Sequence, residues 1–186
     1  MSRADHGNSS EEARWVCAAQ AGDTAAFRQL IDAYERRLYY FLRRFLPRTD
    51  QVLDVLQEVW LTLFRRLPAL REPAAFRVWL YQVAHDRVVS VIRKERREQD
   101  VVAEYSSQLS DESAPLDLST ENAELVHRAL AVLSADHREA IVLHFLEDMK
   151  LEEMADVLGV PAGTVKSRLF YARQALRREL ERLGHE

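Results

Sequence analysis

The stretch GVPAGTVKSRLFYARQAL, residues 159–176, places two glycines and a proline directly before a run with helical spacing. Gly159 follows a short apolar run, where a helix C-terminus favours the left-handed backbone region that glycine adopts without penalty. Pro161 suits the first turn of a new helix, because its missing N–H would be unpaired there in any case. The apolar positions that follow recur every three or four residues, at Val165, Leu169, Ala172 and Leu176. The stretch therefore predicts two helices joined by a tight corner.

The other side of the second helix is basic, hydroxylated and aromatic. It carries Thr164, Lys166, Ser167, Arg168, Phe170, Tyr171 and Arg173. Arg and Lys side chains reach guanine edges or phosphates, and Ser and Thr bond to either. The preceding helix, residues 151–158, is short and acidic on its exposed side, so the basic face is confined to the second helix. We interpret the pair as a helix-turn-helix that reads DNA, with Arg168 at a base edge and Arg173 at a phosphate. An ordinary helical corner with solvated charges is the alternative.

The composition favours a soluble helical protein. Of the 186 residues, 47% are hydrophobic and 30% are charged, but only five are Gly and five are Pro, which leaves little turn chemistry. No apolar run approaches the roughly 20 residues that span a bilayer, and residues 1–14 lack the apolar core of a signal peptide. A single cysteine, Cys17, rules out an internal disulfide framework. We expect a cytoplasmic protein that uses no metal and no cofactor.

Charge is segregated along the chain. The net charge is −4, but residues 98–124 hold eight acidic side chains and no Lys or Arg, so the rest of the chain carries +4. Residues 65–97 hold nine basic and three acidic side chains. The net charge is therefore no argument against a nucleic-acid partner, because the basic side chains are concentrated in particular segments.

Apolar spacing divides the chain into two small all-α domains. Apolar stripes begin near residues 24, 52 and 76, and with a short helix near residues 11–21 they predict a first domain over residues 11–97. Residues 98–123 are acidic and rich in serine and have no sustained period, which predicts a flexible linker. The second domain, residues 124–186, contains the helix-turn-helix, and residues 1–10 are expected to form a flexible tail.

Four segments in order resemble the extracytoplasmic-function (ECF) sigma factors of bacteria. They are DVLQE at 54–58, FRVWL at 76–80, IRKERR at 92–97 and LGVPAGTVKSRL at 158–169. The resemblance extends from about Asp23 to Leu183. It implies a transcription initiation factor that binds core RNA polymerase, directs it to specific promoters and helps to open the minus-ten region. The second domain would read the minus-thirty-five element.

The resemblance also implies roles for individual residues. Asp54, Gln57 and Glu58, which share a helix face at i, i+3 and i+4, would dock on the clamp helices of the polymerase β′ subunit. The loop at 67–76 would capture a flipped base of the minus-ten element. The residues implied for minus-ten DNA are Arg71, Glu72, Phe76, Arg77, Asp86, Arg87, Arg93, Lys94, Arg96 and Arg97. Phe76 also lies on an apolar stripe, where core packing is the alternative role. Further implied partners are the polymerase β flap and an anti-sigma factor or other regulator.

Several positions depart from the family's pattern: Gln51 and Leu53 stand where acids are common, and Phe170 and Tyr171 where His and Arg are frequent. Asp86 stands where Asn is common, Asp148 replaces a common Gly, and Lys150 replaces a capping Ser or Thr at a cost of about 1 kcal/mol.

Other classes of protein fit less well. The six histidines form no H-E-x-x-H pairing, and no Gly-rich phosphate loop is present, so an enzyme is not expected. A two-domain helix-turn-helix regulator that does not bind polymerase would share the T-V-K-S helix, but its receiver domain should alternate strands and helices. A helical adaptor that binds only protein would leave the basic face at 166–173 unexplained.

Overall fold

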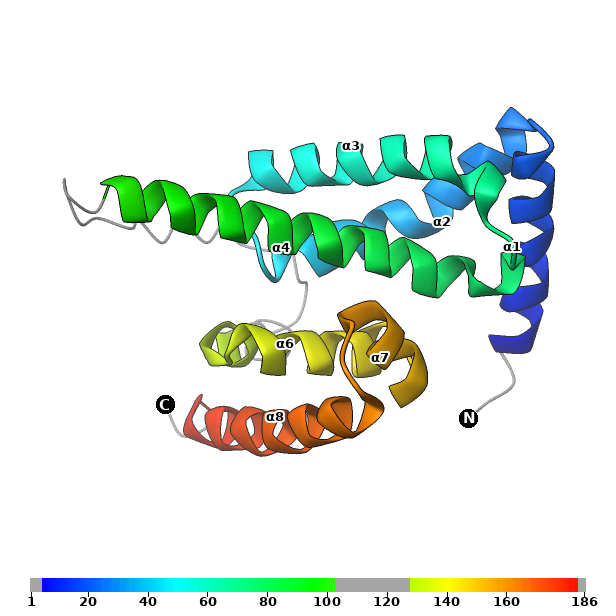
Figure 1. Ribbon diagram of the computed structural model, residues 1–186. Coiled ribbons are helices and arrows are strands. Elements are labelled where there is room, and N and C mark those ends of the chain that lie inside the picture. Colours follow the sequence, from blue (N-terminus) through cyan, green and yellow to red (C-terminus); the bar gives the residue numbers. More distant parts are fainter. Residues whose placement is uncertain (1–4, 103–127, 184–186) are drawn as a thin grey trace. The chain divides into compact units, whose positions relative to one another are not determined.

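The computed structural model describes residues 5–102 and 128–183, and all of the secondary structure within them is helical (Figure 1). This confirms the predicted all-α fold. The chain divides into two compact units, residues 1–111 and 112–186, which we describe one at a time. The division falls within the segment expected to be a linker, of which residues 103–123 lie outside the described part.

In its described residues, the first unit has four α-helices and two short 3-10 turns. They are α1 (Asp5–Gln20), α2 (Thr24–Arg43), α3 (Thr49–Arg66), η1 (Leu67–Ala69), η2 (Pro73–Ala75) and α4 (Phe76–Val102). Figure 1 shows α2, α3 and α4 running alongside one another, with α1 across one end. There α1 packs on α2 and on both turns, so it covers the connection from α3 to α4. Because α4 continues to Val102, it extends five residues beyond the expected domain boundary at Arg97.

Aromatic side chains fill the core between these helices. Phe41 of α2 meets Tyr81 of α4 edge-on, with ring centroids 5.3 Å apart. Tyr34 meets Phe76 in the same way at 5.6 Å, and all four side chains are buried. Burial of such apolar rings stabilises the unit by removing a large area from water.

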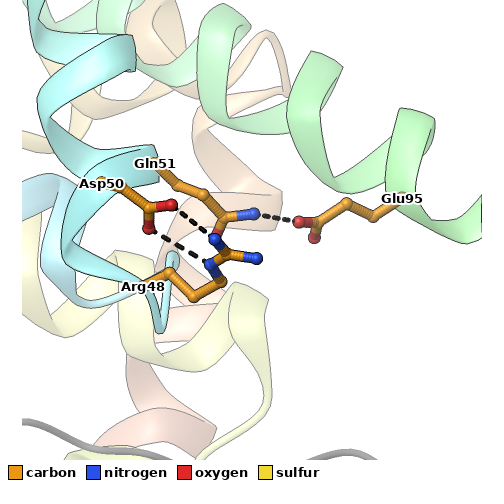
Figure 2. A network of polar contacts seen from close by, with 4 residues as sticks. All are labelled: Arg48, Asp50, Gln51 and Glu95. Atoms are coloured by element: carbon orange, nitrogen blue, oxygen red, sulfur yellow. Dashed lines mark hydrogen bonds and ion pairs between the residues drawn. The ribbon is translucent and has the colours of Figure 1, made fainter.

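A polar network ties the start of α3 to the C-terminal half of α4 (Figure 2). The guanidinium of Arg48 donates two hydrogen bonds to the carboxylate of Asp50, and this pairing lowers the pKa of Asp50. The side-chain amide of Gln51 donates to the carboxylate of Glu95 on α4. The first turn of α3 is thereby connected to α4 at the end remote from α1 (Figure 1).

The second unit is a cluster of short helices that pack against one long helix. Its described elements are a helical stretch at 128–132, α6 (Ala135–Ile141), a π-helical turn η3 (Val142–Leu146), α7 (Leu151–Leu158) and α8 (Ala162–Leu183). Arg138 of α6 donates to the carbonyl oxygens of Leu130, Ala131 and Leu133, at 2.9, 2.7 and 3.0 Å. These bonds pair carbonyls at the end of the stretch 128–132 and just beyond it, where a helix leaves its last carbonyls short of partners.

The corner between α7 and α8 has the predicted backbone geometry. Gly159 lies in the left-handed region at φ 63°, and the amide of Val160 donates to the carbonyl of Ala155 at 3.2 Å. Pro161 lies one step earlier than expected. Its carbonyl accepts from the amides of Thr164 and Val165 at 2.8 and 3.1 Å, so Pro161 caps α8 instead of lying in its first turn.

The turn before α7 accommodates the departures at Asp148 and Lys150. Asp148 adopts φ 50°, the left-handed conformation for which glycine is usual and which Asp tolerates better than most residues. The side chain of Lys150 cannot accept a hydrogen bond, so it cannot cap α7 as Ser or Thr would. Its backbone N–H, however, donates to Glu153 Oε2 at 2.8 Å. Half of a capping box is therefore present without the Ser or Thr.

Candidate functional site

The three α3 residues expected to dock on polymerase are all exposed, but they do not form one isolated face. Glu58 Oε2 lies 3.2 Å from Arg87 Nη1 on α4, so Glu58 points toward that helix. Gln57 points the other way, into a groove beside α2. Asp54 lies between them on the outer surface of α3.

The groove beside Gln57 is apolar, and the sequence analysis did not predict it. It has a volume of about 420 Å³ and its lining residues include Phe27 of α2 and Leu53, Trp60, Leu61 and Phe64 of α3. Phe64 is 68% exposed, and Leu53 and Leu61 are also exposed. Its ring packs edge-on against Phe27, with centroids 5.7 Å apart.

A sequence signal for this groove exists. Leu53, Leu61 and Phe64 lie on the side of α3 opposite to its fully buried positions Val52, Val59 and Leu63. One buried face cannot accommodate apolar residues on both sides of a helix. Exposed apolar side chains gathered on one side of a helix are a common feature of interaction surfaces and ligand grooves.

The connection from α3 to α4 divides the predicted minus-ten residues into two groups. Arg71 and Glu72 are exposed at its tip, where they are free to meet a ligand. Phe76 is completely buried against Tyr34 and Trp79, so it cannot contact DNA and instead supports the loop. Arg77 is half-buried. Burial raises the pKa of Glu12 on α1, and the charge of Arg77 opposes part of that rise.

Along α4, the residues predicted to contact minus-ten DNA occupy more than one face of the helix. Asp86, Arg93 and Arg97 are exposed at i, i+7 and i+11, which places them on one side of the helix. Arg87 points toward α3, where it pairs with Glu58 and its Nη2 donates to Thr62 Oγ1 at 3.3 Å. Lys94 is exposed, and the side chain of Arg96 lies outside the described part of the chain.

Most of the predicted DNA-reading residues of α8 project into solvent. Lys166, Ser167, Phe170, Tyr171 and Arg173 are exposed, whereas Thr164 is half-buried. The rings of Phe170 and Tyr171 meet edge-on at 5.4 Å. The Arg173 guanidinium lies 5.0 Å from the ring centroid of Phe145 and 3.4 Å from His144 Nε2, so this cation is held against η3.

Arg168 is the exception on this helix. Its Nη2 lies 3.0 Å from Asp136 Oδ2 in the first turn of α6, and its side chain is only 25% exposed. In this arrangement Arg168 links α8 to α6, and the predicted contact with a base edge would require this ion pair to break. Beside the pair, burial and the charge of Asp136 raise the pKa of Glu139 to about 8, and Arg168 partly opposes the rise.

Within the described residues, no cluster of His, Cys, Asp or Glu is suited to hold a metal ion. The same part of the chain has no helix long and apolar enough to cross a membrane.

Comparison with known proteins assigns each of the two units to a known family. Residues 30–98 match the model of sigma-70 region 2, and residues 123–176 match that of sigma-70 region 4. The chain is 34% identical to the ECF RNA polymerase sigma-E factor of Escherichia coli strain K12, over 88% of this chain and 91% of that one. It is 28% identical to the ECF RNA polymerase sigma factor SigW of Bacillus subtilis strain 168, over 87% and 92% of the two chains.

Solved structures show the same fold. The sigma factor RpoE of Bartonella quintana, solved in complex with the anti-sigma factor NepR, is 26% identical, with a TM-score of 0.71 over 83% of this chain and 96% of that one. A helical unit of region 2 followed by a helix-turn-helix unit of region 4 defines a transcription initiation factor of the alternative sigma class. Within that class, the chain belongs to the ECF RNA polymerase sigma factors. The match of the first unit to region 2 leaves no support for a regulator that does not bind polymerase.

Proposed function

We propose that the first unit docks on the β′ clamp helices of core RNA polymerase through the groove beside α3. The observation that carries this proposal is the exposed apolar set Leu53, Leu61 and Phe64, with Asp54 on the neighbouring surface of α3. An apolar core with a polar edge is the usual composition of a protein interface. Glu58 contributes less directly, because it is already paired with Arg87.

Two surfaces then contact promoter DNA. The exposed tip of the connection from α3 to α4, with Arg71 and Glu72, captures a base that leaves the minus-ten duplex, while the basic side chains of α4 hold phosphates. In the second unit, α8 enters the major groove of the minus-thirty-five element. Lys166, Phe170 and Tyr171 are the exposed side chains best placed near its start to meet DNA.

The same proposal covers partners and location. RNA synthesis belongs to the polymerase, so this chain needs no catalytic residues, and it acts where the polymerase acts, in the cytoplasm. The second unit would also contact the polymerase β flap. The complex of the Bartonella quintana sigma factor with NepR supports an anti-sigma factor as a further partner.

Substitutions on α3 test the docking surface. Asp54→Arg combined with Phe64→Ser should abolish co-purification with core polymerase and leave the thermal unfolding temperature nearly unchanged, because both side chains are exposed. Phe170→Ser, an exposed aromatic in the second unit, is the matched control and should bind core normally. Undiminished binding by the α3 variant would contradict this docking surface.

A further inference from the structure

Helix α1 is hydrogen-bonded to the start of the loop that connects α3 to α4. Gln20, the last residue of α1, donates from Nε2 to the carbonyl oxygen of Leu67 at 2.9 Å and to that of Leu70 at 2.7 Å. An amide NH₂ group has two hydrogens, so it can satisfy both carbonyls at once. These two bonds fix the backbone at the first residue of η1 and at the residue that follows it, Leu70, and the next residue along the chain is Arg71.

Helix α1 also supports the end of this loop, where α4 begins. Glu12 is buried and accepts a hydrogen bond from the hydroxyl of Tyr34. The Tyr34 ring packs on Phe76, the first residue of α4. Gln20 and Glu12 therefore act on opposite ends of the same short connection, and the exposed residues Arg71 and Glu72 lie between the two supports.

The position of Gln20 is itself fixed by the corner between α1 and α2. Gly22 adopts φ 94°, a conformation that residues with a Cβ rarely adopt. Asp23 then caps α2, because its Oδ1 accepts from the amides of Ala25 and Ala26 at 2.8 and 3.2 Å. Asp23 also donates its own amide to the carbonyl of Ala18 at 3.0 Å. These hydrogen bonds fix the end of α1, and with it the position of the Gln20 side chain.

We propose that Gln20 is a positioning residue for base recognition by this loop. It fixes the backbone from which Arg71 and Glu72 project, so the loop loses less conformational freedom when it closes on a base. The proposal rests on the proposed function of the loop in the minus-ten region. It predicts an effect on preference at one promoter position and none on docking to polymerase, because the groove beside α3 contains no residue of α1.

The test compares holoenzymes assembled from core polymerase and full-length variants. Gln20→Leu keeps the side-chain volume and removes both donors, and Gln29→Leu, at an exposed position of α2, is the matched control. The probe is a pool of single-stranded non-template oligonucleotides randomised over the minus-ten positions. We expect Gln20→Leu to reduce the base preference at one position about five- to tenfold, the effect of losing hydrogen bonds of ordinary strength, and the control to leave it unchanged.

Two results would overturn the proposal: an unchanged preference at every position, or an equal loss of affinity for all sequences, which a merely structural role would give. If Gln20→Leu fails to fold, Gln20→Asn replaces it, because its shorter side chain keeps the donors but not their reach. The same two results then decide.

A second pair of variants separates this inference from the function on which it rests. Arg71→Ala and Glu72→Ala are measured in the same pool. If neither changes the preference at any position, the loop does not read a base and its proposed function fails. If they change one position and Gln20→Leu leaves that position unaltered, the positioning role alone fails.

Discussion

The buried carboxyl of Glu139 makes the stability of the second unit depend on pH. Glu139 is only 7% exposed, and burial together with the nearby charge of Asp136 raises its pKa from 4.5 to about 8. In the folded protein the carboxyl therefore keeps its proton up to about pH 8, whereas in the unfolded chain it loses the proton above about pH 4.5. Between these values the unfolded state binds fewer protons, so stability falls as the pH rises.

Glu139→Gln should remove this dependence. We expect the free energy of unfolding of the wild-type second unit to fall by more than about 1.4 kcal/mol between pH 5 and pH 8, which is the free energy of a single pKa unit. In the variant it should fall much less. Urea titrations followed by the NMR methyl signals of the buried Ala140 and Ala172 report this unit specifically. Glu152→Gln, at an exposed position of α7, is the matched control and should behave as the wild type. Parallel pH profiles for wild type and Glu139→Gln would refute the burial argument.

At the scale of the elements, the sequence predicts what depends on neighbouring residues and misses what depends on distant ones. The left-handed Gly159 follows from local chemistry, and so do the apolar side of α8 and the cap at Asp23. The inward turn of Arg168 could not be predicted, because Asp136 lies 32 positions earlier and only the packing of α6 on α8 joins them. The support given by Gln20 depends on tertiary packing in the same way, because Leu67 and Leu70 lie about fifty positions later.

The role of Arg168 as a link between α6 and α8 can be tested against the role predicted from the sequence. Arg168→Ala and Asp136→Asn should each lower the stability of the second unit by up to about 1 kcal/mol, and the double variant should cost little more than one of them. Lys166→Ala should leave stability unchanged and lower the salt slope of promoter binding by about one unit. A changed preference at a single promoter position in Arg168→Ala, without the same change in Asp136→Asn, would instead establish a base contact.

At the scale of the whole molecule, the two units divide the proposed work. In the proposed function, the first unit would carry the polymerase groove and the minus-ten surfaces, and the second would carry the minus-thirty-five helix. The segment that follows α4 is acidic, with six carboxylates and no Lys or Arg over residues 103–127. Such a segment is repelled by DNA, so it would join the two DNA-binding surfaces without binding DNA itself.

Joining the units in one chain should therefore matter more than either unit's own affinity. When one module is bound, the other is presented to its site at an effective concentration near the millimolar range, which raises avidity by about 10²–10⁴ over separate modules. A protease site inserted between residues 103 and 127 allows the same protein to be compared before and after cleavage. At submicromolar protein, we expect cleavage to reduce promoter-specific run-off transcription by core polymerase at least tenfold, and added excess of residues 112–186 to restore it in part. If cleavage leaves transcription unchanged, polymerase holds each unit independently, and the covalent connection contributes nothing to promoter selection.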